Sequence, residues 1–320
     1  MTVPWDVIIV GGGNAAFCAA HAACEAGARV LLLEKAPREA RGGNSFFTAG
    51  AVRTTFTGLD DVLPLLDNPN DPRLAVTDLP PYTPADFAAD MARVTEGRCD
   101  PALTEILVND AGPVVRWLRE RGLHWRLMYD RQSFQVDGRY RFWGGLALGV
   151  VGEGVGLIEQ HVVSAEAAGV VIRYDSPVVD LVRDGGAVTG VVVAGPEGRE
   201  TVRAGAVVLA CGGFEANADE RAAHLGPAWR AAKVRGTRYN TGEGLRLALA
   251  AGAQPYGDWA GCHAIQWDAA APPYGDRALT HRFSKQSYPL SLLVNHEGRR
   301  FLDEGADYRN YTYAKYGAVV

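Results

Sequence analysis

The N-terminal stretch alternates between apolar runs and glycine-rich turns in a pattern that predicts a strand, a helix and a second strand. Residues 6–10 read DVIIV, a mostly apolar run of the length of one buried strand. Three glycines follow, and residues 14–20 are then rich in alanine and compatible with a helix. Residues 28–33 again read as a strand, and Glu34 follows them directly. This order is typical of the first unit of a doubly wound α/β sheet.

The first glycine turn has the spacing G-x-G-x-x-A, formed by Gly11, Gly13 and Ala16. The first glycine allows a tight bend, the second lets the backbone approach a pyrophosphate, and the small third residue lets helix and strand pack closely. Free N–H groups at the start of the helix favour phosphate binding. Glu34 is placed to accept hydrogen bonds from ribose hydroxyls, and it would repel the 2′-phosphate of NADP. The motif leaves open an NAD site, an FAD site and a turn that binds nothing.

A second glycine-rich turn distinguishes between the two dinucleotides. Residues 42–45 (GGNS) come soon after the ribose acid, and residues 48–51 (TAGA) follow them. In a nicotinamide dehydrogenase the second strand normally continues into another strand–helix unit. A cofactor that extends past its pyrophosphate needs a second backbone cradle, and FAD is such a cofactor. The turn therefore favours FAD, and the alternative is a surface glycine loop.

Residues 60–125 combine a proline-rich stretch with helical periodicity, and we expect them to form a helical insertion. Thr83 and Asp100 each precede a proline, which is the pattern of an N-cap followed by the first helical residue. The apolar residues after Thr83 share one helix face. They are therefore expected to be core residues.

Residues 178–203 contain three β-like runs with turn signals between them, and a buried-type strand is predicted at residues 206–210. A β-meander that returns to a buried parallel strand is not the ordinary topology of an NAD domain, and it favours the FAD-binding variant of the fold. Residues 236–244 lead into another helix N-terminus, which suits an anion or a ribityl chain.

The expected fold class is α/β, with a FAD-binding doubly wound (Rossmann-like) domain that carries a β-meander and a partial α+β capping domain. We expect the FAD-binding domain to span residues 1–255, with the helical insertion at about 60–125. The start of an incomplete substrate-capping domain is expected at residues 256–320, where tryptophan, histidine and arginine mix with proline and tyrosine.

Composition narrows the class of protein. The chain has 38 glycines among 320 residues, more than the ~7% of an average protein. Hydrophobic residues make up 48% and charged residues 22%, which excludes a disordered chain. The net charge of −5 argues against a nucleic-acid surface, and no apolar stretch approaches the ~18 residues of a membrane span. Five scattered cysteines and a first strand that begins at Asp6 predict no disulfide framework, no leader peptide and a cytoplasmic location.

Several segments together resemble the flavoprotein family of fumarate reductase and succinate dehydrogenase: DVIIVGGGNAA, LLLEKAP, RGGNS, VVLACGGFEAN and RGTRYNTGEG. Three segments resemble its FAD-dependent tricarballylate dehydrogenase branch: KVRGTRYNTGEG, DWAGCHA and EGADYRNYTYAKYG. The resemblance covers essentially the whole chain. It implies an FAD-dependent dehydrogenase that oxidises a small polycarboxylate across a carbon–carbon bond, with tricarballylate becoming cis-aconitate.

The resemblance also implies roles for single residues. A hydride passes between substrate and flavin, Arg309 moves the proton on the other face, and His263 binds a substrate carboxylate. The backbone around Ser45 and Ala49–Ala51 faces the flavin ring. Arginine is a poor base unless an acid relays its proton, although its planar fork pairs well with carboxylates. The alternative roles are a surface ion pair for Arg309 and a structural histidine for His263.

The motifs and the resemblance together give one set of candidate residues. The candidate catalytic residues are Arg309 and His263, and no metal ligand is expected. FAD is expected to be non-covalent, because the membrane-bound relatives attach it through a histidine near the second glycine turn and this chain has none between His21 and His124. The candidate cofactor-binding residues are Gly11, Gly13, Asn14, Ala15, Ala16, Glu34, Lys35, Gly42, Gly43, Asn44, Ser45, Ala49, Gly50, Ala51, Val178, Ala210, Gly212, Gly213, Thr241, Gly242 and Glu243.

The chain departs from the resembling family at three places. Ala16 replaces the third glycine and Glu243 stands where the fumarate reductases usually have aspartate, and both changes are tolerable. A threonine–glutamate pair that binds a substrate carboxylate is replaced by residues 282–285 (RFSK), whose basic pair would favour an additional carboxylate. The family continues beyond the equivalent of Val320 with a segment that closes over the flavin, so we expect this chain to be C-terminally truncated.

The expected partners are a small polycarboxylate substrate and a separate electron-transfer protein that reoxidises the flavin, with neither nucleic acid nor a direct membrane span. The alternatives are a soluble fumarate reductase-like enzyme, a ketosteroid dehydrogenase or aspartate oxidase, and a non-catalytic FAD-binding fragment. A steroid would need an apolar cap with a tyrosine acid, and the arginine and histidine content of residues 263–309 argues against it.

Overall fold

The computed structural model describes residues 5–196, 198–284, 291–295 and 297–304. The chain divides into two compact units, each assembled from separate stretches of sequence. The first unit comprises residues 1–16, 28–47 and 172–320, and the second comprises residues 17–27 and 48–171. The expected domain boundary between residues 255 and 256 does not coincide with this division, and it stays a prediction.

A six-stranded sheet forms the centre of the first unit, in the order β10-β11-β12-β1-β2-β9. β1 (Trp5–Val10) pairs in parallel with β2 (Val30–Leu33) on one side and with β12 (Gly198–Leu209) on the other. β9 (Val171–Arg173) forms the edge beside β2. Because three parallel strands end at the same side of the sheet, the glycine turns that follow them meet there.

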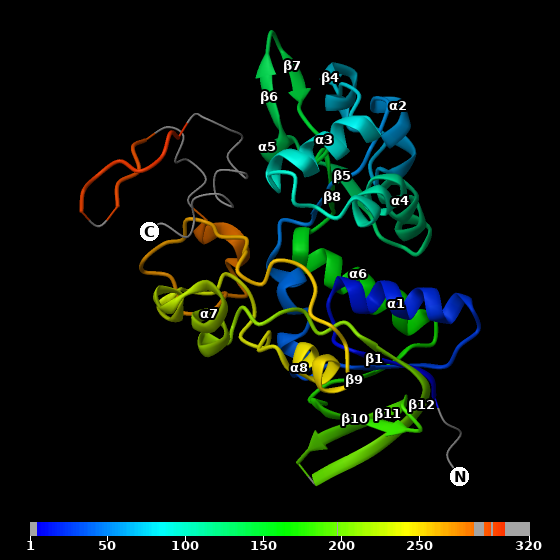
Figure 1. Ribbon diagram of the computed structural model, residues 1–320. Helices are drawn as coiled ribbons and strands as arrows, with labels where there is room; N and C mark the ends of the chain where they lie inside the picture. Colours follow the sequence, from blue (N-terminus) through cyan, green and yellow to red (C-terminus); the bar gives the residue numbers. More distant parts are fainter. Residues whose placement is uncertain (1–4, 197, 285–290, 296, 305–320) are drawn as a thin grey trace. The chain divides into compact units, whose positions relative to one another are not determined.

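The predicted β-meander is present as β10 (Val178–Asp184), β11 (Ala187–Gly195) and the first half of β12 (Figure 1). The predicted break before residue 206 is wrong, because β12 is one continuous strand. Its residues up to Arg203 pair with β11 and those from Ala204 pair with β1, on opposite edges of the strand. The second half is also less buried than predicted, since Val208 is 37% exposed.

The core of the first unit lies between the parallel strands and the meander. Ile8, Leu31 and Val191 are fully buried there. Leu247, from helix α8 (Glu243–Ala250), packs against the same core. The remaining short elements of this unit are α7 (Ala218–Leu225), η1 (Arg38–Ala40), η2 (Gly43–Phe47), η5 (Pro227–Ala231) and η6 (Thr280–Phe283).

The second unit contains the whole of the predicted helical insertion, residues 60–125. Its long helices begin where the sequence predicts: Thr83 forms a capping box with Asp86 at the start of α3 (Pro84–Val94), and Asp100 accepts a hydrogen bond from the Leu103 N–H at the start of α4 (Pro101–Glu120). The other elements are α2 (Leu59–Val62), η3 (Leu63–Leu65), η4 (Pro72–Val76), α5 (Tyr129–Gln132) and α6 (Glu153–Ala167). Helix α1 (Asn14–Glu25) starts in the first unit and continues into this one.

Two small sheets complete the second unit. One has the order β3-β8-β5, formed by Ala51–Val52, Leu148–Val150 and Trp125–Leu127. The other has the order β4-β7-β6, formed by Thr77–Asp78, Arg139–Phe142 and Ser133–Val136. Trp125 and Leu148 lie at the centre of the apolar core that joins these strands to α3 and α4.

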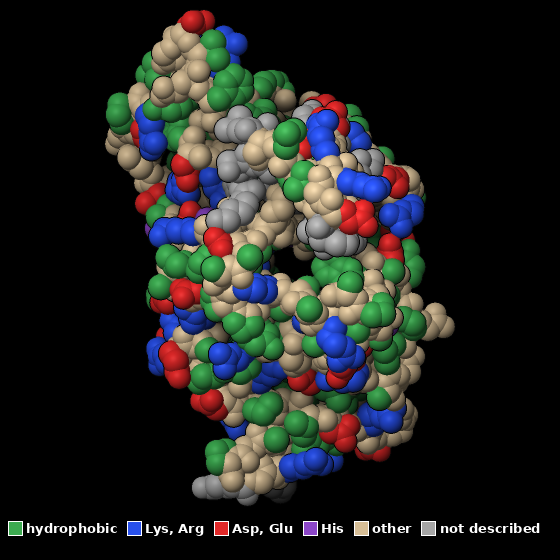
Figure 2. Space-filling view, turned by 90° about the vertical axis from the view of Figure 1, so that its left-hand side faces the viewer, with side chains coloured by type: hydrophobic (Ala, Val, Ile, Leu, Met, Phe, Trp, Pro, Cys, Tyr) green, Lys and Arg blue, Asp and Glu red, His purple; other side chains and the backbone are tan. Residues whose placement is uncertain are grey.

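Two surface properties bear on partners. None of the helices in the described part of the chain is long and apolar enough to cross a bilayer. Figure 2 shows acidic and basic side chains interspersed over the visible face, without an extended basic patch.

Candidate functional site

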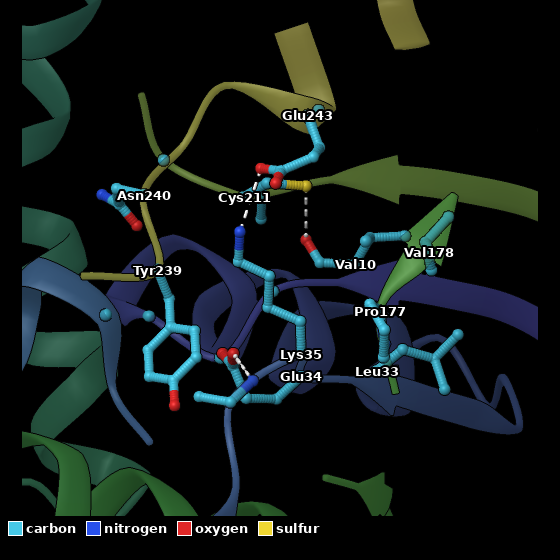
Figure 3. Close-up of a pocket in the computed structure, with 18 of the residues that line it drawn as sticks. Val10, Leu33, Glu34, Lys35, Pro177, Val178, Cys211, Tyr239, Asn240 and Glu243 are labelled. Carbon is cyan, nitrogen blue, oxygen red and sulfur yellow. Dashed lines mark hydrogen bonds and ion pairs between the residues drawn. The ribbon is translucent and has the colours of Figure 1, made fainter. Parts of the chain in front are cut away.

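A cavity of about 610 Å³ opens in the first unit where β1, β2 and β12 end (Figure 3). Val10, Leu33 and Ala210, at the carboxyl ends of these strands, all line it. Ligands of doubly wound sheets bind at this edge, and the volume lies within the ~300–1,000 Å³ of small-molecule sites. Every residue that lines the cavity belongs to the first unit.

The three glycines of the first turn differ in what they are needed for. Gly11 has φ +116°, and a Cβ there would clash with the carbonyl oxygen of Ala210. A Cβ at Gly12 would lie 2.6 Å from a carboxylate oxygen of Glu34. A Cβ at Gly13 would lie 3.4 Å from its nearest protein neighbour, the Ser45 Oγ, which is an ordinary contact. Packing within the protein therefore requires glycine at positions 11 and 12. At position 13 the protein itself leaves room for a side chain, and glycine keeps that room open for a ligand next to the backbone.

The second glycine turn is tied to two other walls of the cavity. Ser45 Oγ accepts a hydrogen bond of 3.1 Å from the N–H of Asn14, the first residue of α1. Asn44 Oδ1 accepts one of 2.9 Å from the N–H of Thr237. These contacts hold the two glycine turns and the 236–244 loop around one space, which is the arrangement that an extended dinucleotide needs.

Glu34 lies at the end of β2, lines the cavity and is 6% exposed. Burial raises its pKa, and hydrogen bonds from backbone N–H groups, including the 2.8 Å bond from Ala36, offset part of this effect. A buried carboxylate with a fixed orientation is well suited to accept hydrogen bonds from ribose hydroxyls.

Lys35, Thr241 and Glu243 are connected by hydrogen bonds. Figure 3 shows Lys35 and Glu243, which both line the cavity. Lys35 Nζ donates to Thr241 Oγ1 at 2.8 Å and to Glu243 Oε2 at 3.0 Å, and the Thr241 hydroxyl donates to Glu243 Oε1 at 2.5 Å. Desolvation raises the pKa of Glu243, but the hydrogen bonds from the Thr241 hydroxyl and the Lys35 ammonium lower the pKa by more than desolvation raises it. The net pKa of Glu243 is therefore below its ordinary value. Glu243 is therefore an anion at neutral pH.

The cavity has an apolar side and a polar side (Figure 3). Val10, Leu33, Pro177 and Val178 group together on the apolar side, which suits a flat apolar ring. On the other side lies Asn240, whose Nδ2 donates to Glu215 Oε2 at 3.2 Å. The cavity therefore has different chemistry at its two sides, as a ligand with a ring and a polar chain requires.

The structure brings most of the candidate cofactor residues to this one cavity. Those that line it are Gly11, Gly13, Asn14, Ala15, Glu34, Lys35, Gly43, Asn44, Ser45, Val178, Ala210, Gly212 and Glu243. Ala16 is buried, and Gly42, Gly213, Thr241 and Gly242 are direct sequence neighbours of lining residues. Ala49, Gly50 and Ala51 belong to the second unit, at or beside β3, and their role stays a prediction.

Sequence reasoning missed several lining residues, among them Ser176, Pro177, Thr237, Tyr239 and Asn240. The last three lie in the RGTRYNTGEG motif, so the motif itself could have identified them. Ser176 and Pro177 carry no glycine or charge signal. Their position follows from the turn into β10.

The structure describes one of the two candidate catalytic residues. His263 lies in the first unit and is exposed. Desolvation by its surroundings and the positive charge of Arg235 lower its pKa, so its imidazole is neutral at pH 7. Arg309 lies outside the described residues. Within the described ranges, no group of three or more histidine, cysteine, aspartate or glutamate side chains is placed to hold a metal ion.

A doubly wound sheet with a glycine turn at a helix N-terminus and a second glycine cradle defines a flavoprotein of the FAD-binding class. Residues 6–316 match the family model described as FAD binding domain. The chain therefore belongs to this family, of the fumarate reductase and succinate dehydrogenase flavoprotein type, and its cofactor is FAD. The predicted fold class is confirmed.

The relatives are reductases and dehydrogenases. Fumarate reductase (cytochrome) of Shewanella frigidimarina is 28% identical over 301 residues, which cover 93% of this chain and 48% of that protein. Vinyl phenol reductase of Lactiplantibacillus plantarum is 28% identical over 320 residues, covering 97% and 58%. The chain thus spans about half the length of the curated relatives it matches. The solved 3-ketosteroid-Δ4-(5α)-dehydrogenase of Rhodococcus jostii RHA1 shares the fold, with a TM-score of 0.71 and 21% identity over 99% of this chain and 64% of that one.

Proposed function

We propose that the protein is an FAD-dependent oxidoreductase that oxidises a small polycarboxylate across a carbon–carbon bond. The observation that carries this proposal is the cavity at the ends of β1, β2 and β12, with its free space at Gly13. The reactions named for the relatives support the reaction class. Because the chain spans about half of those proteins, the activity, the substrate and the partners are part of the proposal.

The cavity residues divide between the parts of FAD. Gly13 and the first turn of α1 would hold the pyrophosphate, Glu34 the ribose hydroxyls and the apolar group around Pro177 the adenine ring. The anion of Glu243 would accept hydrogen bonds from the ribityl chain. When bound, FAD supplies an acceptor for a hydride. Binding is proposed to be non-covalent.

The proposed substrate is tricarballylate, which would be oxidised to cis-aconitate. A neutral His263 can donate a hydrogen bond to a substrate carboxylate, and Arg309 is proposed to move the proton. Arg282 is exposed and would attract a further carboxylate. A separate electron-transfer protein would reoxidise the flavin, and a cytoplasmic location stays a prediction.

Two other functions remain as alternatives. The fold is shared with a steroid dehydrogenase, but this likeness does not extend to the substrate. A chain that binds FAD without catalysing a reaction is the second alternative. Flavin reduction by candidate substrates distinguishes all three.

The cofactor proposal is tested by FAD titration of the purified chain. Gly13→Val should abolish binding, because its side chain would occupy the pyrophosphate position. Gly195→Val is the matched control, because Gly195 ends β11 outside the cavity. A Cβ there would lie 3.8 Å from its nearest neighbour, the carbonyl oxygen of Gly198. Full flavin stoichiometry in Gly13→Val would contradict the site. Denaturation should release all flavin, and flavin that remains on the polypeptide would disprove non-covalent binding.

The substrate proposal is tested by anaerobic reduction of the bound flavin. Tricarballylate should bleach the flavin absorbance faster than succinate, and a neutral steroid should leave it unchanged. The rate should fall as salt rises, because charge pairs exposed to solvent are screened over about 8–10 Å at physiological ionic strength. Faster reduction by the steroid would overturn the polycarboxylate assignment, and no reduction by any of these acids would favour the non-catalytic alternative.

A further inference from the structure

Arg277 holds both ends of the second glycine turn. Its Nη1 donates a hydrogen bond of 3.1 Å to the carbonyl oxygen of Arg41, directly before the turn. Its guanidinium carbon lies 3.4 Å from the ring centroid of Phe46, directly after the turn. The residues between these anchors, Gly43–Ser45, line the cavity. Arg277 therefore fixes the ends of a segment whose middle faces the proposed FAD site.

The surroundings of Arg277 make these contacts strong. Phe46 is 6% exposed and packs edge-on against Phe47 at 5.3 Å, and Arg277 is itself half-buried. A cation on an aromatic face contributes more when water is excluded from it. The planar guanidinium can stack on a ring and donate in its own plane at once, which lysine cannot do.

Arg277 belongs to a loop that closes on itself, residues 267–284, which we call the cap loop. Its ends form a β-bridge between Trp267 and Ser284. Within it, Asp276 Oδ1 accepts hydrogen bonds from the N–H groups of residues 278 and 279 at 2.8 and 2.9 Å. The cap loop is therefore internally ordered around Arg277.

The cap loop also docks on a second wall of the cavity. The N–H of Gly275 donates to the carbonyl of Gly236 at 2.8 Å, and the N–H of Val234 donates to the carbonyl of Pro273 at 2.9 Å. Thr237, the next residue after Gly236, lines the cavity and holds Asn44 of the second glycine turn. The cap loop thus contacts both the turn and the segment that holds the turn.

We infer that Arg277 is a positioning residue that preorganises the second glycine turn and couples FAD binding to the docking of the cap loop. This inference rests on the proposed FAD site. Coupling is reciprocal: if docking of the loop strengthens FAD binding, FAD must strengthen docking of the loop by the same factor. Arg282, which is proposed to attract the substrate, lies on the cap loop. FAD binding would therefore stabilise the docked position of the loop that carries it.

Arg277→Met tests this inference, with hydrogen exchange as a readout that does not depend on activity. Loss of the ring contact and the hydrogen bond should weaken FAD binding about tenfold. In the unmodified protein, FAD should slow amide exchange across the cap loop, and in Arg277→Met this added protection should be lost even at saturating FAD. Arg230→Met is the control, since Arg230 is an arginine of the same unit with a side chain 60% exposed and paired with Asp219. It should behave like the unmodified protein.

Phe46→Leu provides a second, independent test, because it removes the ring and leaves the Arg41 carbonyl in place. Its FAD affinity should lie between those of the unmodified protein and Arg277→Met. Unchanged affinity and unchanged protection in Arg277→Met would overturn the inference. If circular dichroism shows that Arg277→Met does not fold, Phe46→Leu decides: unchanged FAD affinity and unchanged protection of the cap loop in that variant would overturn the inference. Normal FAD binding by Gly13→Val would instead show that the proposed FAD site is wrong.

Discussion

Alanine substitutions at Gly11 and Gly13 should separate the stability of the fold from the binding of FAD. Gly11 has φ +116°, where any other residue is strained by ~1–3 kcal/mol. Its new Cβ would also clash with the carbonyl oxygen of Ala210, and a backbone shift that relieves such overpacking costs ~1–3 kcal/mol. The N–H of Gly11 donates to the carbonyl of Leu33 at 2.8 Å, so the shift would also disturb β2. We expect Gly11→Ala to lower the free energy of unfolding by about 3 kcal/mol.

Gly13→Ala should leave the stability of the fold almost unchanged and weaken FAD binding. Its Cβ would make an ordinary contact with Ser45 Oγ, so the free energy of unfolding without FAD should change by less than ~1 kcal/mol. The methyl group would, however, occupy space that a pyrophosphate needs next to the backbone. Loss of one charge-assisted hydrogen bond of ~1.5–3 kcal/mol should weaken FAD binding about 10–100-fold.

Urea and thermal unfolding without FAD measure the change in stability, and fluorescence titration with FAD measures the change in binding. For Gly11→Ala the melting temperature should fall by about 6 °C, at roughly 2 °C per kcal/mol for a chain of this size. A Gly11→Ala protein as stable as the unmodified one would refute the packing argument. Equal losses of stability in the two variants would refute the distinction between the glycines.

Three further predictions concern buried charge, the polar side of the cavity and catalysis. His161 is fully buried against Phe17, and burial lowers its pKa to about 3. Below pH ~6.5 the unfolded chain takes up a proton on this histidine, whereas the folded protein does not. The free energy of unfolding therefore falls by ~1.4 kcal/mol for each pH unit below ~6.5. His161→Phe should lose less stability than the unmodified protein between pH 7 and pH 5 in urea unfolding, and identical losses would contradict the assignment. Lys35→Met should weaken FAD binding about two- to fivefold, as expected for a partly exposed ion pair, with recovery in Lys35→Arg; full affinity in Lys35→Met would contradict a role for the Glu243 pair. Arg309→Lys should lower kcat about 10²–10⁴-fold with an unchanged flavin spectrum, and near-normal kcat at saturating substrate would exclude proton transfer by Arg309.

Local features of the fold could be predicted from the order of amino acids alone. The caps at Thr83 and Asp100 were predicted because each depends on contacts within about four residues. The turn at Gly11–Gly13 and the acid after β2 were predicted because their spacing along the chain is typical of a strand–turn–helix–strand unit. The order of β-like runs also predicted the meander. The segments that resemble the family predicted FAD as the cofactor, because several such local motifs occur together along one chain.

The set of residues that share the cavity, and the role of each, follow from tertiary packing and could not be predicted from local patterns. The pairing of Lys35 with Glu243, the bond from Asn14 to Ser45 and the contact of Arg277 with Phe46 all join residues far apart in sequence. The continuity of β12 likewise depends on which neighbour pairs with each half. Local patterns cannot specify these contacts, because they depend on how strands and loops pack together. The same packing separates Gly11, which the fold itself requires, from Gly13, which leaves space for a cofactor.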